Sequence, residues 1–345
     1  MTPFPQPFQH LIQATTDPTE LPASNGFPEA WHSWSDVERH AVIQAWASGR
    51  PLLVRGEPGC GKSQLARAVA AVLHVPLFAL VVHPRFEATD VLYRIDLVER
   101  LAQAQLASAL FSTVDRTATD PAEWLKAQLD NRRYTQPGVI WQAFDADAPT
   151  DASDQPRAAD WPRAVVLLDQ IDKADSDVPN ALLEVFANRS FSVPGQSEVH
   201  ALTSHLPLTI ITTNEDRELP PAFVRRCAVL NLRPKDANES EFVGWLQERA
   251  MAHQKLARLA EGGADSAMAR AAAQVWADRE AAQKLDLPSV GLAEYLDLLY
   301  SLLRLSGDDP ARALALLDRL APFALVKNRD QDQTRPAIDR AGDPA

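Results

Sequence analysis

Short apolar runs alternate along the chain with segments of helical periodicity. The run at 52–54 is followed by a Gly-rich turn and an Ala- and Leu-rich stretch that ends near Leu73. A second apolar run covers 75–82. Strand, loop, helix and strand in this order predict a βαβ unit of a parallel sheet. Three more strands are predicted by the apolar runs at 164–168, 206–213 and 228–232.

Helical signals flank this strand-rich region on both sides. Ser35-Asp36-Val37-Glu38 fits a capping box, and apolar residues then recur at helical spacing until Gly49. From residue 236 to about 327 the composition is helical, with several Gly and Pro breaks. The sequence therefore predicts an α/β domain at 35–235 and a helical domain at 236–327.

The remaining segments are predicted from their composition. Residues 1–34 are rich in Pro and Thr, which indicates an N-terminal arm or a partly ordered lead-in. Residues 90–142, which include an insert at 98–142, are predicted to be mostly helical. A buried face is expected at the start of this segment, formed by Leu92, Ile95, Leu97, Val98 and Leu101. Residues 328–345 are predicted to be a disordered tail.

Two further segments lie inside the α/β domain. Residues 145–160 are acidic and poor in apolar side chains, and their scattered carboxylates favour a solvated loop over a metal site. The sequence RSFSVPGQSEVHAL is rich in turn residues and predicts a hairpin through Pro194-Gly195.

The Gly-rich turn has the spacing G-x-x-x-x-G-K-[ST]. Its glycines let the backbone N–H groups surround a phosphate, Lys62 can reach the β- and γ-phosphates, and the Ser63 hydroxyl can bind Mg²⁺. A chance match would rarely lie between a strand and a helix. The residues expected to bind nucleotide are Gly56, Glu57, Pro58, Gly59, Cys60, Gly61, Lys62, Ser63 and Gln64.

Polar residues follow two of the other predicted strands. Asp169 ends the run AVVLLD, where an ATPase with this loop supplies a second Mg²⁺ contact. The predicted metal ligands are thus Ser63 and Asp169. Asn214 ends the next strand, as a turn-forming residue or as a group that orients water. Arg225 and Arg226 follow, either as ordinary surface arginines or as a finger that reaches a neighbouring subunit's nucleotide.

Composition narrows the classes of partner. The chain has 345 residues, 34 of them Lys or Arg and 46 Asp or Glu, and its net charge is −12. The charge and the lack of a basic run speak against nucleic acid or an anionic membrane as the main partner. Two cysteines fit a reducing compartment, and no leader or membrane span is evident. We therefore expect a cytoplasmic protein.

The ordered set GEPGCGKS, VVLLDQIDKADSDVPNALLEVF and ITTNEDRELPPAFVRRC, followed by a helical remainder, resembles the AAA+ ATPases, most closely their MoxR-like branch. The resemblance covers about 35–327. It implies an ATP- and Mg²⁺-dependent core with a helical lid, working as a ring that is usually hexameric and remodels a partner protein. MoxR-like ATPases often work with a protein that carries a von Willebrand factor A domain.

The resemblance also implies roles for single residues. Gly56 to Ser63 would be Walker A, Asp169 the Walker B carboxylate and Asn214 sensor 1. Arg226, with Arg225 beside it, would be the arginine finger. The insert at 98–142 resembles the helix-2 insert of this branch, and the predicted hairpin resembles its pre-sensor hairpin. Phe86, in the loop after the second strand, would either face a central pore or be buried, and burial is the commoner case for a Phe.

Two departures from the family pattern change the expectation. Gln170 stands where the family has the Glu that serves as general base, and an amide accepts no proton at neutral pH. ATP binding should survive while hydrolysis becomes slow or absent. The intact surroundings favour an introduced Glu→Gln exchange over a natural loss. The second departure is the lid, where 287–291 offer no sensor 2 Arg.

Three other functions fit part of the sequence. A scaffold that binds ATP without turnover is consistent with a natural Gln170. A helicase loader would share the ATPase core, although the acidic charge speaks against it. A small-molecule kinase would share the phosphate loop but would not need Asn214 and Arg226.

Overall fold

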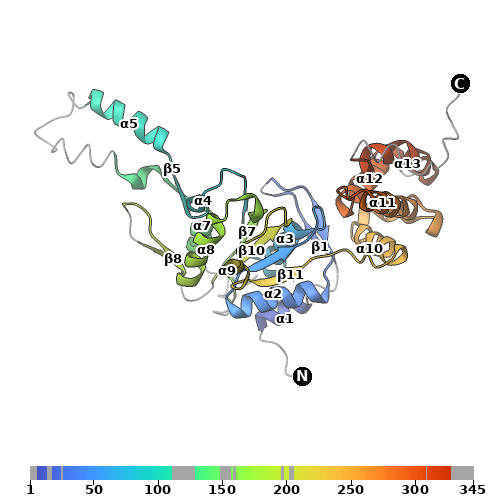
Figure 1. Cartoon of the computed structure of the whole chain (residues 1–345), viewed down its shortest axis with the longest axis horizontal. Coiled ribbons are helices and arrows are strands. Elements are labelled where there is room, and N and C mark those ends of the chain that lie inside the picture. The colour runs from blue at the N-terminus through green and yellow to red at the C-terminus, as the bar shows by residue number, and fades with distance from the viewer. Residues whose placement is uncertain are drawn as a thin grey trace, which may run out of the picture. The chain divides into compact units, whose positions relative to one another are not determined.

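The computed structural model describes residues 6–13, 18–24, 26–110, 129–147, 157, 161–195, 198–201, 206–307 and 309–327. These residues form two compact units (Figure 1). The first unit comprises 1–16, 35–55 and 66–230, and the second comprises 17–34, 56–65 and 231–345. The predicted acidic loop at 145–160 lies almost entirely outside the described residues, and the predicted tail at 328–345 lies wholly outside them.

A five-stranded sheet in the order β11-β3-β10-β7-β4 forms the centre of the first unit. β10 pairs in parallel with both β3 and β7, and β4 pairs in parallel with β7. All residues of β7 and β10 are buried, as expected for strands covered on both faces. The strands are β3 (Leu52–Arg55), β4 (Leu77–Val81), β7 (Val165–Asp169), β10 (Leu208–Thr213) and β11 (Ala228–Asn231).

Helices pack around this sheet. The predicted capping box is confirmed, because the Ser35 side chain accepts from Glu38 N–H while the Glu38 carboxylate accepts from Ser35 N–H. The helices are α1 (Gln6–Gln13), α2 (Asp36–Ser48), α4 (Ala88–Leu92), α7 (Val139–Asp145), α8 (Asp177–Asn188), α9 (Pro221–Val224) and the short 3-10 helix η3 (Ile171–Lys173). The helix α3 (Lys62–Leu73) begins in the second unit and continues into the first.

Strands and helices both occur in and just before the insert. β5 (Tyr93–Ile95) pairs antiparallel with β6 (Thr135–Pro137), and α5 (Leu97–Leu110) leads away from the sheet in Figure 1. The 3-10 helix η2 (Asn131–Tyr134) precedes β6. The predicted buried face is wrong for α5, because Leu97, Val98 and Leu101 are 64%, 80% and 62% exposed. The sequence period was helical, but the described residues place no core beside this helix.

Two smaller predictions near the sheet have different outcomes. The predicted hairpin is confirmed, because β8 (Ser190–Phe191) and β9 (Val199–His200) pair antiparallel around the turn at Pro194 and Gly195. The expectation that Phe86 faces a pore is wrong. Phe86 is 5% exposed and packs in the apolar core of the first unit, where its transfer from water stabilises the fold.

The second unit is built mainly from helices with a shared apolar core. The helices are α10 (Glu239–Met251), α11 (Ala267–Lys284), α12 (Leu292–Ser306), α13 (Pro310–Leu325) and the 3-10 helices η4 (Gln254–Ala260) and η5 (Gly263–Asp265). Together with the parallel sheet, this helical region confirms the predicted fold class.

The N-terminal segment is more ordered than the predicted arm. Besides α1, it contains β1 (Thr19–Leu21) and β2 (Ala30–His32), which pair antiparallel. This strand pair belongs to the second unit, where the Trp31 ring lies 5.0 Å from the His253 ring and Lys255 forms an ion pair with Glu29 at 2.8 Å. The low apolar content of this segment gave no signal for these strands. The residues that hold it in place lie more than two hundred positions away in the sequence.

No helix in the described part of the chain is long and apolar enough to cross a membrane.

Candidate functional site

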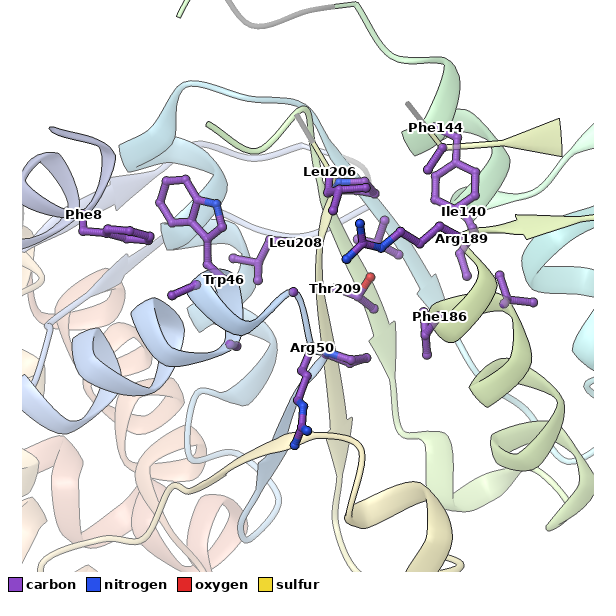
Figure 2. A pocket seen from close by; sticks show the side chains of 18 residues that line it. Phe8, Trp46, Arg50, Ile140, Phe144, Phe186, Arg189, Leu206, Leu208 and Thr209 are labelled. Atoms are coloured by element: carbon purple, nitrogen blue, oxygen red, sulfur yellow. The ribbon is translucent and has the colours of Figure 1, made fainter. Parts of the chain in front are cut away.

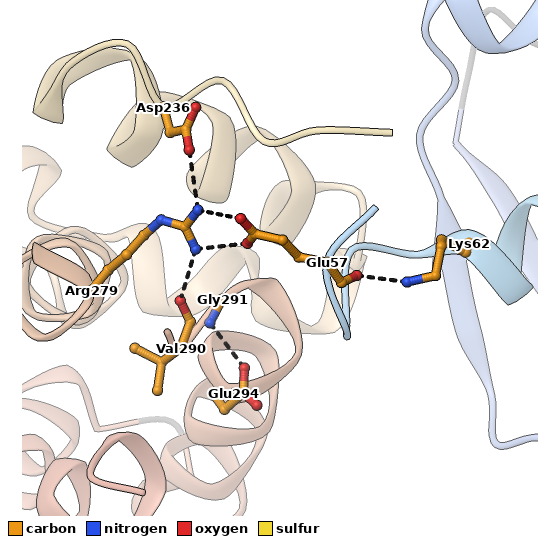
Figure 3. A network of polar contacts seen from close by, with 7 residues as sticks. All are labelled: Glu57, Lys62, Asp236, Arg279, Val290, Gly291 and Glu294. Carbon is orange, nitrogen blue, oxygen red and sulfur yellow. Dashed lines mark hydrogen bonds and ion pairs between the residues drawn. The ribbon is translucent and has the colours of Figure 1, made fainter. Parts of the chain in front are cut away.

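The predicted phosphate loop joins β3 to α3. Lys62 is the first residue of α3 and is 6% exposed. Its Nζ donates hydrogen bonds to the carbonyl oxygen of Gly56, at 2.8 Å, and to that of Glu57, at 2.7 Å. Figure 3 shows the bond to Glu57. An ammonium has three N–H donors, so these two bonds leave one for a phosphate oxygen. The loop thus holds a positive charge within itself, at the start of a helix whose N-terminal end also favours anions.

Two glycines of the loop have no room for a side chain. A Cβ at Gly56 would lie 2.2 Å from the carbonyl oxygen of Leu232. A Cβ at Gly59, where φ is +75°, would lie 2.7 Å from the Cβ of Ala293. Ala293 is in the first turn of α12, so the helical region packs directly against the phosphate loop. The two glycines are therefore needed for this close approach as well as for binding phosphate.

The loop also carries a thiol. Burial raises the pKa of Cys60, while the ammonium of Lys62 acts in the opposite direction. Cys60 is a free cysteine of intermediate exposure. It is therefore a poor nucleophile at neutral pH, and a packing role in the loop fits it better than a chemical one.

At the carboxyl end of β7, Asp169 is held by a residue of the neighbouring strand. Thr212 is fully buried, and its hydroxyl donates to Oδ1 of Asp169 at 2.5 Å. The same hydroxyl oxygen accepts the backbone N–H of Gln170 at 2.9 Å. Thr212 thus fixes both residues of the Asp-Gln pair. Sequence reasoning missed Thr212, although its place two residues before Asn214 is a usable signal.

Gln170 itself adopts an unusual backbone conformation. Its φ and ψ are 61° and 53°, in the left-handed region that a residue with a side chain seldom occupies. Such conformations concentrate at functional sites, where the surrounding structure imposes them. Its side chain is half-buried, and an amide there can orient water by hydrogen bonding but cannot take a proton from it.

A second carboxylate joins the loops after β7 and β10. Asp172 is 1% exposed, and its oxygens accept the backbone N–H groups of Asn214, at 3.3 Å, and Asp216, at 3.0 Å. The candidate sensor residue is therefore positioned by a buried Asp three residues after Asp169. Sequence reasoning missed Asp172 as well, because nothing local distinguishes it from its acidic neighbours.

The two arginines after α9 are exposed. Neither Arg225 nor Arg226 forms a side-chain hydrogen bond or ion pair with the part of the chain that the structure describes. By contrast, nearby Arg217 pairs with Asp175 at 3.2 Å. Two uncompensated guanidinium groups are therefore available for an anion on another molecule.

These residues form two groups, one in each compact unit. Asp169, Gln170 and Asn214 lie together at the carboxyl ends of β7 and β10, in the first unit. The phosphate loop, with Ser63, belongs to the second unit and is continuous with β3, whose last residue is in register with Thr213.

In the described residues, no group of three or more His, Cys, Asp or Glu side chains could hold a metal. Mg²⁺ needs no such group, since phosphate and water oxygens complete its coordination.

A buried cation contacts the phosphate loop from a position other than the one expected for sensor 2. Arg279 of α11 is 2% exposed and forms an ion pair with the Glu57 carboxylate in the phosphate loop at 2.7 Å. The two residues are 222 positions apart in sequence. The segment at 287–291, where the resemblance predicts this residue, contributes instead the Val290 carbonyl, 3.5 Å from Arg279.

A cavity of about 410 Å³ lies in the first unit, beside the amino-terminal ends of the strands (Figure 2). Its lining is mostly apolar and includes Phe8, Trp46, Phe144 and Leu208, with Arg189 extending across it. Asp169 and Thr213 end their strands at the opposite edge of the sheet. This cavity is therefore not part of the candidate nucleotide site.

Comparison with known proteins decides the family. The profile of the AAA domain, dynein-related subfamily, matches residues 51–227, which is more than half of the chain. The chain belongs to the AAA ATPase family. The match covers the phosphate loop, Asp169, Gln170, Asn214 and both arginines, and the MoxR-like assignment made from the sequence is confirmed.

Shorter matches connect this AAA ATPase to individual proteins. It is 33% identical over 76 residues to the denitrification regulatory protein NirQ of Stutzerimonas stutzeri, covering 22% of the chain and 28% of that protein. NirQ of Pseudomonas aeruginosa is 37% identical over 51 residues, covering 15% and 20%. The chain thus spans less than a third of the length of these relatives. The crystal structure of NtrX from Brucella abortus covers 88% of the chain and 59% of NtrX, with 14% identity and a TM-score of 0.42.

Proposed function

We propose that this AAA ATPase binds ATP and Mg²⁺, assembles into a ring and remodels or activates a partner protein, with hydrolysis held low by Gln170. The observation that carries the proposal is the arrangement of three neighbouring strands. β3 leads into the phosphate loop, β7 ends at Asp169, and β10 lies between them and supplies Thr212. Ligands of parallel sheets bind at this edge.

The proposed binding roles follow from the chemistry of each group. The loop from Gly56 to Gln64 would surround the phosphates with N–H donors, and Lys62 would add its positive charge. Ser63 and Asp169 offer a hydroxyl and a carboxylate, which are the oxygen ligands that Mg²⁺ prefers. Bound Mg²⁺ would neutralise charge on the β- and γ-phosphates.

The proposed limit on turnover lies at one side chain. The water that attacks the γ-phosphate is activated by a group that accepts its proton, and the Gln170 amide does not. Thr212 holds the backbone of Gln170 in place, so a carboxylate at this position would have the same support. We therefore expect hydrolysis to depend on whether the side chain at position 170 ends in an amide or in a carboxylate.

Assembly and a partner protein are proposed on separate grounds. Arg225 and Arg226 are exposed and uncompensated within the described chain, which suits fingers that reach the nucleotide of a neighbouring subunit. The similar NirQ proteins are named as denitrification regulatory proteins, which supports a regulatory role toward another protein. MoxR-like ATPases often work with a protein that carries a von Willebrand factor A domain, so such a protein is the first candidate partner to test.

The decisive experiment compares ATP turnover and ATP binding in the chain as it stands and in Gln170→Glu. We expect both to bind MgATP and only the Glu variant to hydrolyse it. Gln44→Glu, on the exposed side of α2, adds the same charge far from the sheet edge and should leave turnover low. Absence of ATP binding in the unmodified chain would refute the proposal.

The second candidate function is a scaffold that ATP switches without being consumed. Gln170 favours it if this residue is natural. ATP binding and ring assembly in both chains, without turnover in Gln170→Glu even when candidate partners are present, would decide for the scaffold. Phosphoryl transfer from ATP to a metabolite would instead identify a kinase.

A further inference from the structure

Arg279 holds a carboxylate that belongs to the phosphate loop. Its guanidinium donates to both carboxylate oxygens of Glu57, at 2.7 and 2.8 Å, and to Asp236 at 3.1 Å (Figure 3). The guanidinium is 2% exposed, whereas the two carboxylates are 49% and 42% exposed. The Glu57 pair has the two-pronged geometry that makes Arg–carboxylate bonds both strong and specific in direction.

The charge of Arg279 and the orientation of Glu57 both affect the phosphate loop. The hydrogen bonding of Arg279 to the Glu57 carboxylate is the main cause that raises the pKa of Arg279, so the guanidinium stays charged. Figure 3 shows the Glu57 carboxylate extending toward Arg279, while the Glu57 carbonyl accepts from Lys62 on the other side. Glu57 therefore connects Arg279 with Lys62, the lysine that we expect to bind the phosphates.

A free carboxylate in this loop would oppose nucleotide binding. A nucleoside triphosphate carries several negative charges, and an unpaired Glu57 within the same loop would repel them. Paired with Arg279, the carboxylate is neutralised and held in one direction.

We propose that Arg279 is a positioning residue for nucleotide binding, which acts through Glu57 and does not contact the phosphates. It would set the affinity for a nucleoside triphosphate by removing the charge of Glu57 from the site and by fixing the Glu57 carbonyl that holds Lys62. This inference rests on the proposed ATP binding and identifies a residue from α11 that the candidate site requires.

The test measures the dissociation constant of MgATP for the full chain by calorimetry, at low and at high salt. Arg279→Met keeps the length of the side chain and removes its charge, and we expect ATP to bind roughly tenfold more weakly because Glu57 is left unpaired. Glu57→Gln alone removes the carboxylate from the loop and is the reference for the double variant. In Arg279→Met/Glu57→Gln, affinity should be within about threefold of that reference, since the repelling charge in the phosphate loop is gone.

Two controls separate charge from folding. Arg270, on the same helix, is 58% exposed and pairs with Asp265, so Arg270→Met removes an equal charge and should leave affinity unchanged. The weakening in Arg279→Met should also shrink at high salt, because ions screen the repulsion. A loss of packing would not depend on salt in this way. If Arg279→Met does not fold, Arg279→Lys, which loses the two-pronged contact, should show a smaller weakening that Glu57→Gln removes.

The outcomes are distinct. Unchanged affinity in the Arg279 variants, or a weakening that Glu57→Gln does not reverse, would overturn the inference while leaving the proposed function intact. Failure of the unmodified chain to bind ATP would overturn the proposed function, and this inference with it.

Discussion

The Thr212 hydroxyl donates to Asp169 across two neighbouring strands at 2.5 Å. This bond orients a buried carboxylate whose strand ends there, and the hydroxyl oxygen also accepts the N–H of the next residue, Gln170. One side chain on β10 therefore fixes Asp169, the last residue of β7, and Gln170, which follows it, and the proposed chemistry depends on both. The family pattern specifies the two residues at the end of this strand. Here the geometry of both, Asp169 and Gln170, is set by a threonine of the neighbouring strand.

Removing that hydroxyl should weaken both the fold and the metal contact. In Thr212→Val the Gln170 N–H and one Asp169 oxygen lose their partner in a buried site, at a cost of about 1–3 kcal/mol in unfolding free energy. Denaturant titration measures this loss, and the Mg²⁺ dependence of ATP binding should shift to higher concentration. Thr212→Ser keeps the hydroxyl and should retain both properties. Unchanged Mg²⁺ dependence in Thr212→Val would contradict the positioning role.

Arg226 should act on a neighbouring subunit. In the Gln170→Glu chain, Arg226→Ala is expected to reduce turnover on the order of a thousandfold, because an arginine finger stabilises charge in the transition state. Arg217→Ala, which removes a nearby surface ion pair with Asp175, should change turnover little.

A mixing experiment tests the role in trans directly. Arg226→Ala subunits retain their phosphate loop, and Lys62→Ala subunits retain their arginines, so a mixture should recover part of the turnover that each variant lacks. No recovery, in mixtures shown to form joint oligomers, would place Arg226 outside the neighbour's site.

Cys60 should report on the phosphate loop. Because burial raises its pKa, the rate of alkylation by iodoacetamide should still be rising at pH 9, where an ordinary cysteine is largely ionised. Bound MgATP should slow the reaction by covering the loop. Burial raises the pKa of Cys227 to about 12, so a Cys60→Ser chain should remain almost unlabelled. Labelling that ATP leaves unchanged would argue against nucleotide in this loop.

His253 should make the fold sensitive to acid. Burial lowers its pKa from about 6.5 to about 4, and its Nδ1 lies 2.7 Å from the Tyr300 hydroxyl oxygen. Since the unfolded chain binds the proton first, stability is complete above pH 6.5 and falls as pH drops toward 4, by up to about 3 kcal/mol. His253→Gln removes the titrating group and should flatten this part of the pH profile. His40→Gln, at an exposed position, should leave it as it is.

What could be predicted from the sequence is what local patterns encode. The phosphate loop is a run of fixed residues between a strand and a helix, and the parallel strands are continuous apolar runs. β7 and β10 therefore appear within two residues of their predicted bounds. Asp169 and Asn214 could be chosen because the ends of buried strands are recognisable.

What could not be predicted depends on distant contacts. Glu57 and Arg279 are 222 residues apart, and each reads locally as an ordinary charged residue. The apolar positions of α5 have helical spacing, but spacing does not say whether another element covers them. The resemblance suggests a pore position for Phe86, but its loop packs the ring into the apolar core, which the local sequence does not reveal.

The N-terminal strand pair has a consequence for the order of folding. Arg249 donates to the carbonyl oxygen of Ser33, 216 residues earlier, and Lys255 reaches Glu29 over 226. These contacts form only after Arg249 and Lys255 have left the ribosome. Most of the α/β unit is encoded between the two groups of contacting residues, so its sheet can assemble before Glu29 and Ser33 meet their partners. The helical unit is then completed by contacts between segments that lie on either side of the sheet in the sequence.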